Sequence, residues 1–317
     1  QGVSSAASDV YKRQYLAKQT TQNVEKKLWD ILQTNLKAID NLVKYVGTLD
    51  DSLKFVRLGS DVCPMYTHPD YQWFWNDTTV RLYLEKHLAV VGQYARDNNI
   101  RLSFHPGQFC ALSSDNDDIV LNSIDEIEYH TDLAKWMGYG KSFHDDGFKI
   151  NVHISGKRGV AGMIEAFSLL STEARNLITI ENDENSYGLD DCLTLAKYCP
   201  IVLDIHHHWC KENEYINVDD ARVSKVIDSW RGIRPVIHYS ISAEQFLPNH
   251  PAHDLLDRDQ LIQNGINKQK LRAHSNFFWN DAVNQWAVSF LNSFDIQCEA
   301  KAKNLASFQL YEQYCNC

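Results

Sequence analysis

The sequence predicts an α/β fold, a TIM (β/α)8 barrel that lacks or replaces its first strand. Short apolar runs alternate with helical patterns along the chain, and this rhythm implies parallel strands joined by helical crossovers. Side chains of His, Asp or Glu follow the apolar runs, as expected where strand ends form an active-site rim. No linker or low-complexity stretch interrupts the 317 residues, a length that suits one barrel.

The individual elements follow from hydrophobic periodicity. From Asn23 to Val46, apolar residues recur at three- and four-residue steps, which predicts a helix. Further helical patterns lie at about residues 79–97, 117–137, 159–170, 189–198, 219–229 and 279–293. The expected strands are Leu53–Leu58, Ile100–Phe104, Phe148–Ile154, Leu177–Ile180, Ile201–Ile205, Pro235–Tyr239 and Asp295–Cys298. A closed barrel needs eight strands, so this count is one short, at the front of the chain.

Residues 1–14 are interpreted as a non-native leader. The segment QGVSSAASDVYKRQ has no apolar periodicity and resembles the translated read-through found in assembled environmental sequences. We therefore expect residues 15–317 to form a single barrel domain whose first strand was lost by truncation.

Composition excludes some classes of protein and narrows others. No apolar run is long enough to span a membrane, and no secretory segment opens the chain. Eight cysteines without a CxxC pair indicate reduced thiols and an intracellular, cytoplasmic protein. The net charge of −10 argues against a general nucleic-acid binder. Bound divalent metals and locally clustered basic residues would offset that charge.

The polar residues at the strand ends carry the chemistry. The runs close with or are followed by His68, His105, His153, Glu181, Asp204, His238 and Glu299. The carboxyl ends of parallel barrel strands meet at one face, where TIM-barrel active sites lie. Imidazoles and carboxylates without clustered thiolates suit Zn, Mn or Fe, and so many on one rim predict two or three ions.

A single histidine at a strand end is more often a hydrogen-bonded core residue than a metal ligand. Seven strand ends that all carry ligand-type groups are different, because burying so many ionisable groups without a metal would be costly. His206 and His208 flank His207 and are expected to point elsewhere, one of them in a structural role.

These residues resemble the UV damage endonucleases over about Lys18 to Lys303. The matching phrases, in this order, are SDVCPMYTHP, LSFHPGQF, NVHISGK, TIENDE, LDIHHH, IHYS, AHSNFF and DIQCEAK. The HPGQF phrase and the IENDE–DIHHH pair, with DIxxEAK at the end, are fairly specific, whereas HPGQ alone is weak.

The resemblance implies a metal-dependent hydrolase, a DNA-repair endonuclease on a TIM barrel similar to the endonuclease four type of abasic-site nuclease. Members nick the DNA backbone 5′ to UV photoproducts in excision repair, with up to three divalent ions. Manganese is the metal expected here, with zinc or magnesium as alternatives. The matching metal ligands are His68, His105, His153, Glu181, Asp204, His207, His238, His274 and Glu299.

The resemblance also implies catalytic and DNA-binding residues. Catalysis is assigned to His105, Glu181, Asp204 and Glu299. The partner is damaged double-stranded DNA, bound by a monomer away from any membrane. Contacts to the lesion or the phosphates are expected from Gln108, Phe109, Lys157, Arg158, Lys301 and Lys303.

Four departures from the family pattern stand out. The family's first strand, with a further probing tyrosine, is absent, and Phe109 stands where tyrosine is usual. Val236 occupies the position of a lysine two residues before His238. An insertion, roughly Ala243 to Arg272, separates His238 from His274.

Three alternatives remain open. A sugar isomerase or epimerase of the xylose isomerase type shares the fold and the metal rim, but one or two ions would distinguish it from a three-metal nuclease. An abasic-site endonuclease shares the chemistry, and competition between UV-damaged and abasic DNA would separate the two. An inactive barrel that only binds a partner would show no turnover.

Overall fold

The computed structural model describes residues 13–107 and 109–314, so most of the predicted leader, residues 1–12, lies outside the described part. The chain divides into two compact units, Gln1–Ile178 and Thr179–Cys317. The expectation of one domain over residues 15–317 stays a prediction. Among the described helices, none has both the length and the apolar character needed to cross a bilayer.

The first unit contains three parallel strands that neighbour one another in chain order. Val56 of β1 lies opposite Leu102 of β2, and Phe104 of β2 lies opposite Ile150 of β3. The strands are β1 (Phe55–Arg57), β2 (Arg101–Phe104) and β3 (Lys149–His153). The helices are α2 (Thr21–Gly47), α3 (Gln72–Trp75), α4 (Thr78–Asp97), α5 (Asp117–Trp136), α6 (Gly159–Leu169) and α7 (Thr172–Leu177), with short 3-10 turns η1 (Asp51–Leu53), η2 (Pro69–Tyr71) and η3 (Asp145–Gly147).

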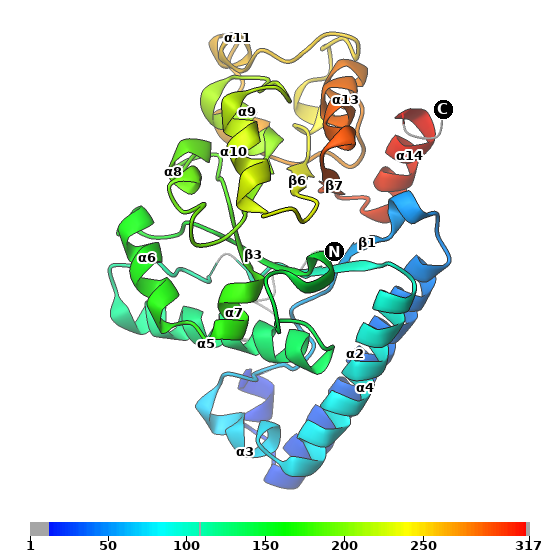
Figure 1. Cartoon of the computed structure of the whole chain (residues 1–317), viewed down its shortest axis with the longest axis vertical. Coiled ribbons are helices and arrows are strands. Elements are labelled where there is room, and N and C mark those ends of the chain that lie inside the picture. The colour runs from blue at the N-terminus through cyan, green and yellow to red at the C-terminus, as the bar shows by residue number, and fades with distance from the viewer. Residues whose placement is uncertain (1–12, 108, 315–317) are drawn as a thin grey trace. The chain divides into compact units, whose positions relative to one another are not determined.

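The two long helices α2 and α4 lie side by side in this unit (Figure 1). The Thr20 side chain caps α2 by accepting from the Asn23 amide, and Asp77 caps α4 by accepting from the amides of Thr79 and Val80. Each cap satisfies amides that have no partner within the helix. One apolar stripe of α2 is buried, as its periodicity predicts.

The second unit contains four strands, again parallel and in chain order. They are β4 (Ile178–Glu181, whose first residue closes the first unit), β5 (Ile201–Asp204), β6 (Val236–Tyr239) and β7 (Asp295–Cys298). The helices are α8 (Leu189–Leu193), α9 (Ile205–Glu212), α10 (Ala221–Ser229), α11 (Arg258–Gln263), α12 (Lys268–Leu271), α13 (Asp281–Val288) and α14 (Asn304–Tyr314), with 3-10 turns η4 (Glu244–Phe246) and η5 (Ser289–Asn292). Val236 is fully buried at the start of β6.

The seven strands of the described residues match the seven predicted runs, with ends shifted by at most two residues. Two predicted helices are too long. The helix expected at residues 189–198 ends at Leu193, because the backbone changes to tighter bonds such as Leu195 N to Cys192 O in the turn that precedes Pro200 and β5. The helix expected at 279–293 ends at Val288 and continues as the 3-10 turn η5.

A substitution tests the close approach of α4 to the end of α5. A Cβ atom on Gly92 would lie 1.9 Å from the Met137 carbonyl oxygen, so Gly92→Ala must push the backbones apart. We expect a loss of about 1–3 kcal/mol in unfolding free energy, despite alanine's higher helix propensity. Urea denaturation measures it. Gly59→Ala, where a Cβ meets nothing within 4 Å, is the control; equal midpoints for both variants would contradict this packing.

Candidate metal centre

The strands of the second unit bring carboxylates and imidazoles together at their carboxyl ends. Glu181 is the last residue of β4, Asp204 is the last of β5, and His238 is paired with Asp204 in the parallel register of β5 and β6. One ligand atom from each of these three residues lies within 4.8 Å of the other two. All three side chains are buried, at 1%, 0% and 0% exposure.

Glu299 follows β7 directly and joins this cluster through His238. The His238 Nδ1 atom lies 3.0 Å from Glu181 Oε2 and 3.5 Å from Glu299 Oε1. His238 therefore lies between two carboxylates that come from strands 118 residues apart in the sequence. This convergence follows from the parallel topology, since both strands end at the same edge of the sheet.

His207 enters the cluster because β5 runs into α9 without a loop. Asp204 is the N-cap of α9, and its Oδ1 atom accepts a hydrogen bond of 2.6 Å from the His207 amide. The His207 ring donates from Nδ1 to the Asn182 carbonyl oxygen at 3.0 Å, since a carbonyl can only accept. In the neutral ring the lone pair is then on Nε2, the atom that can bind a metal.

His274 lies at the margin of the same cluster. Its ring centroid is 6.4 Å from that of His207, and an isolated bridge between Ser242 and His274 fixes its backbone. Burial lowers the pKa of His274, although Glu299 acts in the opposite direction, so the ring favours its neutral, metal-binding form. Six of the predicted ligands thus come together in this unit: Glu181, Asp204, His207, His238, His274 and Glu299.

The electrostatics of this cluster favour protonation of its buried groups. Burial raises the pKa of Asp204 well above its usual range, and the nearby Glu181 and Glu299 raise it further. Burial alone would lower the pKa of His207, but Asp204, Glu181 and Glu184 raise it to about 9. Among the described residues, none donates a hydrogen bond to the buried Asp204 Oδ2. Buried carboxylate oxygens and imidazole nitrogens gathered in this way are the ligand types that divalent ions take.

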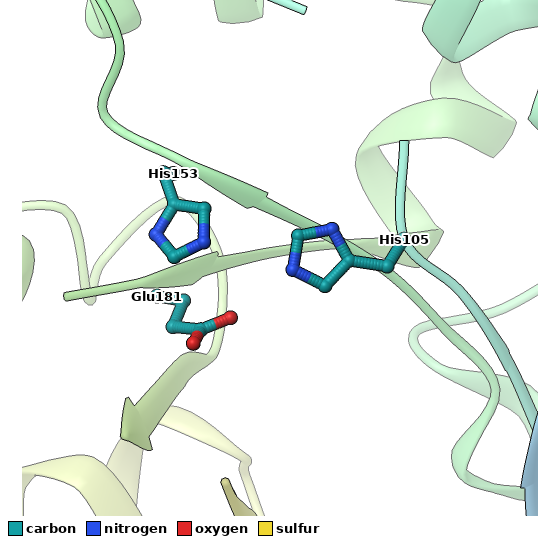
Figure 2. Close-up of side chains that lie close together, drawn as sticks. All are labelled: His105, His153 and Glu181. Carbon is teal, nitrogen blue, oxygen red and sulfur yellow. The ribbon is translucent and has the colours of Figure 1, made fainter. Parts of the chain in front are cut away.

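The first unit contains a separate pair of predicted ligands. His105 directly follows β2 and His153 ends β3, and their ring centroids lie 5.4 Å apart (Figure 2). His105 donates from Nδ1 to the Pro106 carbonyl oxygen at 3.0 Å, which leaves its Nε2 as the ligand atom. His68 instead caps η2, where its Nδ1 accepts from the Asp70 amide at 3.2 Å.

The predicted DNA-contacting residues lie on the surface of their units. Phe109 is 65% exposed, and Lys301 is also exposed. Lys157 pairs with Asp115 at 2.8 Å, and Arg158 pairs with Asp117 and Glu165. Gln108 lies outside the described residues, so its predicted role is untested.

The expectation for the neighbours of His207 is confirmed. His208 Nε2 lies 2.9 Å from Glu214 Oε2, away from the cluster. His206 is buried between two serines, with Nδ1 2.7 Å from Ser240 Oγ and Nε2 3.3 Å from Ser242 Oγ. Ser242 donates its own proton to the Leu271 carbonyl oxygen at 2.6 Å. Ser240 therefore donates to His206, and His206 donates to Ser242.

This relay is a positioning element that the sequence did not reveal. It ties the first turn of α9 to the chain leaving β6 and to the end of α12, three residues before His274. Glu184 was also missed, although it lies in the IENDE phrase; its Oε2 atom is 3.7 Å from His207 Nε2. Its position three residues beyond a predicted ligand was the only available signal.

Comparisons with known proteins identify the relatives of this chain. The family model described as UV-endonuclease UvdE matches residues 5–316. A UV DNA damage endonuclease of Halalkalibacterium halodurans is 30% identical over 296 residues, covering 90% of this chain and 81% of that protein. A UV DNA damage endonuclease of Bacillus cereus strain B4264 is 24% identical over 311 residues, covering 93% and 86%.

A solved structure shows the fold. The crystal structure of SacUVDE matches with a TM-score of 0.72 at 24% identity, over 93% of this chain and 89% of that chain. Together with the parallel strands in chain order, this confirms the predicted α/β, TIM-like barrel fold. On the match of its family model over nearly the whole chain, this protein belongs to the UV-endonuclease UvdE family.

Proposed function

We propose that this protein nicks double-stranded DNA 5′ to UV photoproducts, by metal-dependent hydrolysis of a phosphodiester, in excision repair. The observation that carries the proposal is the buried group of Glu181, Asp204 and His238 with Glu299 and His207 around it. Family membership supports the substrate, because the relatives are named UV DNA damage endonucleases. Manganese is the proposed metal, as two or three ions, with zinc or magnesium as alternatives.

Each residue of the cluster has a defined part in this proposal. Divalent ions held by Glu181, Asp204 and His238 would supply an activated water and would neutralise charge that develops on the phosphate. The carboxylates of Glu181 and Glu299 flank His238, and their negative charge balances the positive charge of the ions. Asp204 does the same while its other oxygen fixes the His207 amide, so that the His207 Nε2 lone pair is presented in one orientation. Membership of His68, His105 and His153 in the same centre stays a prediction.

The DNA-facing residues are proposed from exposure and chemistry. Phe109 offers an exposed aromatic face that can stack at a lesion, where the neighbouring bases are already disturbed. Lys157 and Arg158 are in exposed ion pairs, which contribute little and can be exchanged for phosphates. Lys301 and Lys303 are proposed as further phosphate contacts. We also propose that the protein acts as a cytoplasmic monomer.

The first test of the function replaces a buried ligand. Glu181→Gln keeps the shape of the side chain but removes its charge, so we expect nicking of UV-irradiated plasmid to fall by more than about 100-fold. Circular dichroism should show the fold retained. Glu85→Gln, at an exposed position on α4, is the control and should leave nicking unchanged. Unimpaired nicking by Glu181→Gln would reject the assignment.

The pKa of His207 gives a pH dependence for metal binding. With a pKa of about 9, His207 is protonated near pH 7 in the metal-free protein, whereas a ligating imidazole must be neutral. The raised pKa of Asp204 acts in the same direction, because a protonated carboxyl must also lose its proton. Binding of Mn²⁺ should therefore release protons, and its affinity should rise from pH 6 towards pH 9.

Calorimetric titration with Mn²⁺ at pH 7, in two buffers of different ionisation enthalpy, measures this proton release. His207→Gln should bind more weakly and release fewer protons. A heat of binding that is the same in both buffers, with an affinity that does not change between pH 6 and pH 8, would show that these groups are not displaced by the metal.

A further inference from the structure

We propose that a basic cavity beside the metal cluster binds a backbone phosphate of the substrate DNA, neighbouring the phosphate that is cut. This inference rests on the proposed function and adds a binding site to it. The cavity lies within the second unit and has a volume of about 180 Å³. Its polar walls are formed by Glu184, Asn185, Lys211, Arg258, Lys268 and Arg272.

The charge of the cavity is opposite to that of the chain. Four cationic side chains face a single carboxylate, Glu184, whereas the whole protein carries a net charge of −10. The cations come from separate helices: Lys211 from α9, Arg258 from the start of α11, and Lys268 and Arg272 from the start and the C-cap of α12. Positive charge gathered in a hollow concentrates its field and favours an anion there.

Arg258 forms the structural wall of the cavity. Its Nη1 atom donates to the carbonyl oxygens of Cys210 and Lys211, near the C-terminal end of α9, and its Nε and Nη2 atoms donate to Asp259. Arg258 thereby satisfies carbonyls that the helix leaves unpaired and anchors the segment Ala243–Arg272 to α9. The Nε, Nη1 and Nη2 atoms of Arg258 all donate hydrogen bonds within the protein.

The other three cations are able to hold a ligand. Lys268 Nζ forms no hydrogen bond or ion pair with any residue of the described part. Within the described ranges, Lys211 Nζ has two long contacts, 3.3 and 3.4 Å, to the carbonyl oxygens of Asn185 and Ser186. Arg272 donates to Asn185 Oδ1 and lies 3.9 Å from Glu184 Oε1, and its Nη2 atom forms no hydrogen bond with the described residues. Ammonium and guanidinium groups arranged in this way suit phosphate oxygens.

The position of Glu184 relates this cavity to the metal cluster. Its Oε2 atom lies 3.7 Å from His207 Nε2, and its Oε1 atom lies 3.9 Å from Arg272 Nη1. One carboxylate thus separates a proposed metal ligand from a cation of the cavity. Because only this carboxylate lies between them, a DNA strand with one phosphate at the metals can bring a neighbouring phosphate to the cavity.

The test measures DNA binding and its dependence on salt, without relying on turnover. Each phosphate contact contributes about 0.9 to the slope of log affinity against log salt concentration. Lys268→Gln should therefore weaken binding of a fluorescein-labelled, UV-irradiated duplex and reduce the slope by about 1, measured by anisotropy with no divalent ion added. The double variant Lys211→Gln/Lys268→Gln should reduce it by about 2.

Lys270→Gln is the matched control, since Lys270 lies on the same helix but outside the cavity, with its Nζ 5.4 Å from the ring of Phe246. It should change the slope less than Lys268→Gln does. Equal slopes for wild type, Lys268→Gln and the double variant would overturn the phosphate site, as would an absence of DNA binding by the wild type. Nicking of irradiated duplex by the wild type is assayed separately. If the variants show the reduced slopes but the wild type does not nick irradiated duplex, the proposed function is rejected and the phosphate site is retained.

Discussion

Burial of carboxylates at one place is the constraint on which the second unit depends. Glu181, Asp204 and Glu299 lie where water has little access, and charged carboxylates in such a place are costly unless cations or hydrogen-bond donors compensate them. Burial raises the pKa of Asp204. In His207 burial acts to lower the pKa, but the neighbouring carboxylates raise it to about 9, so both groups favour their protonated forms. Divalent ions would replace those protons as the compensating positive charge. The residues proposed to bind the metal are therefore also residues on which the folded structure of this region depends.

The surrounding structure holds these groups in place by local means. Asp204 both contributes to the cluster and caps α9, so that the same residue sets the position of His207. The buried relay of His206, Ser240 and Ser242 links α9 to the chain after β6 and to the Leu271 carbonyl. The segment from Ala243 to Arg272 is therefore fastened at its end, and it brings basic residues to the edge of the cluster. The hydrogen bond from Ser242 to Leu271 connects these features, because Leu271 also lines the cavity of the proposed phosphate site.

The strands and the main ligands could be predicted because both are local signals. Apolar runs mark the strands, and a residue such as Glu181 or His238 follows from its place at the end of one. Glu184, His206 and the cavity could not be found in this way. Their partners lie in or beside residues 243–272, a segment without a periodic apolar pattern. In addition, a histidine that accepts from one serine and donates to another cannot be told from a metal ligand by sequence. The early end of α8 depends likewise on the turn before Pro200.

The most direct measurement of the central claim is the metal content of the folded protein. Inductively coupled plasma mass spectrometry after equilibration with Mn²⁺ and gel filtration should find at least two ions per chain in the wild type. Asp204→Asn, which keeps the N-cap acceptor but removes the charge, should retain fewer. A folded wild-type protein that holds no divalent ion, with the same result for Asp204→Asn, would contradict the account.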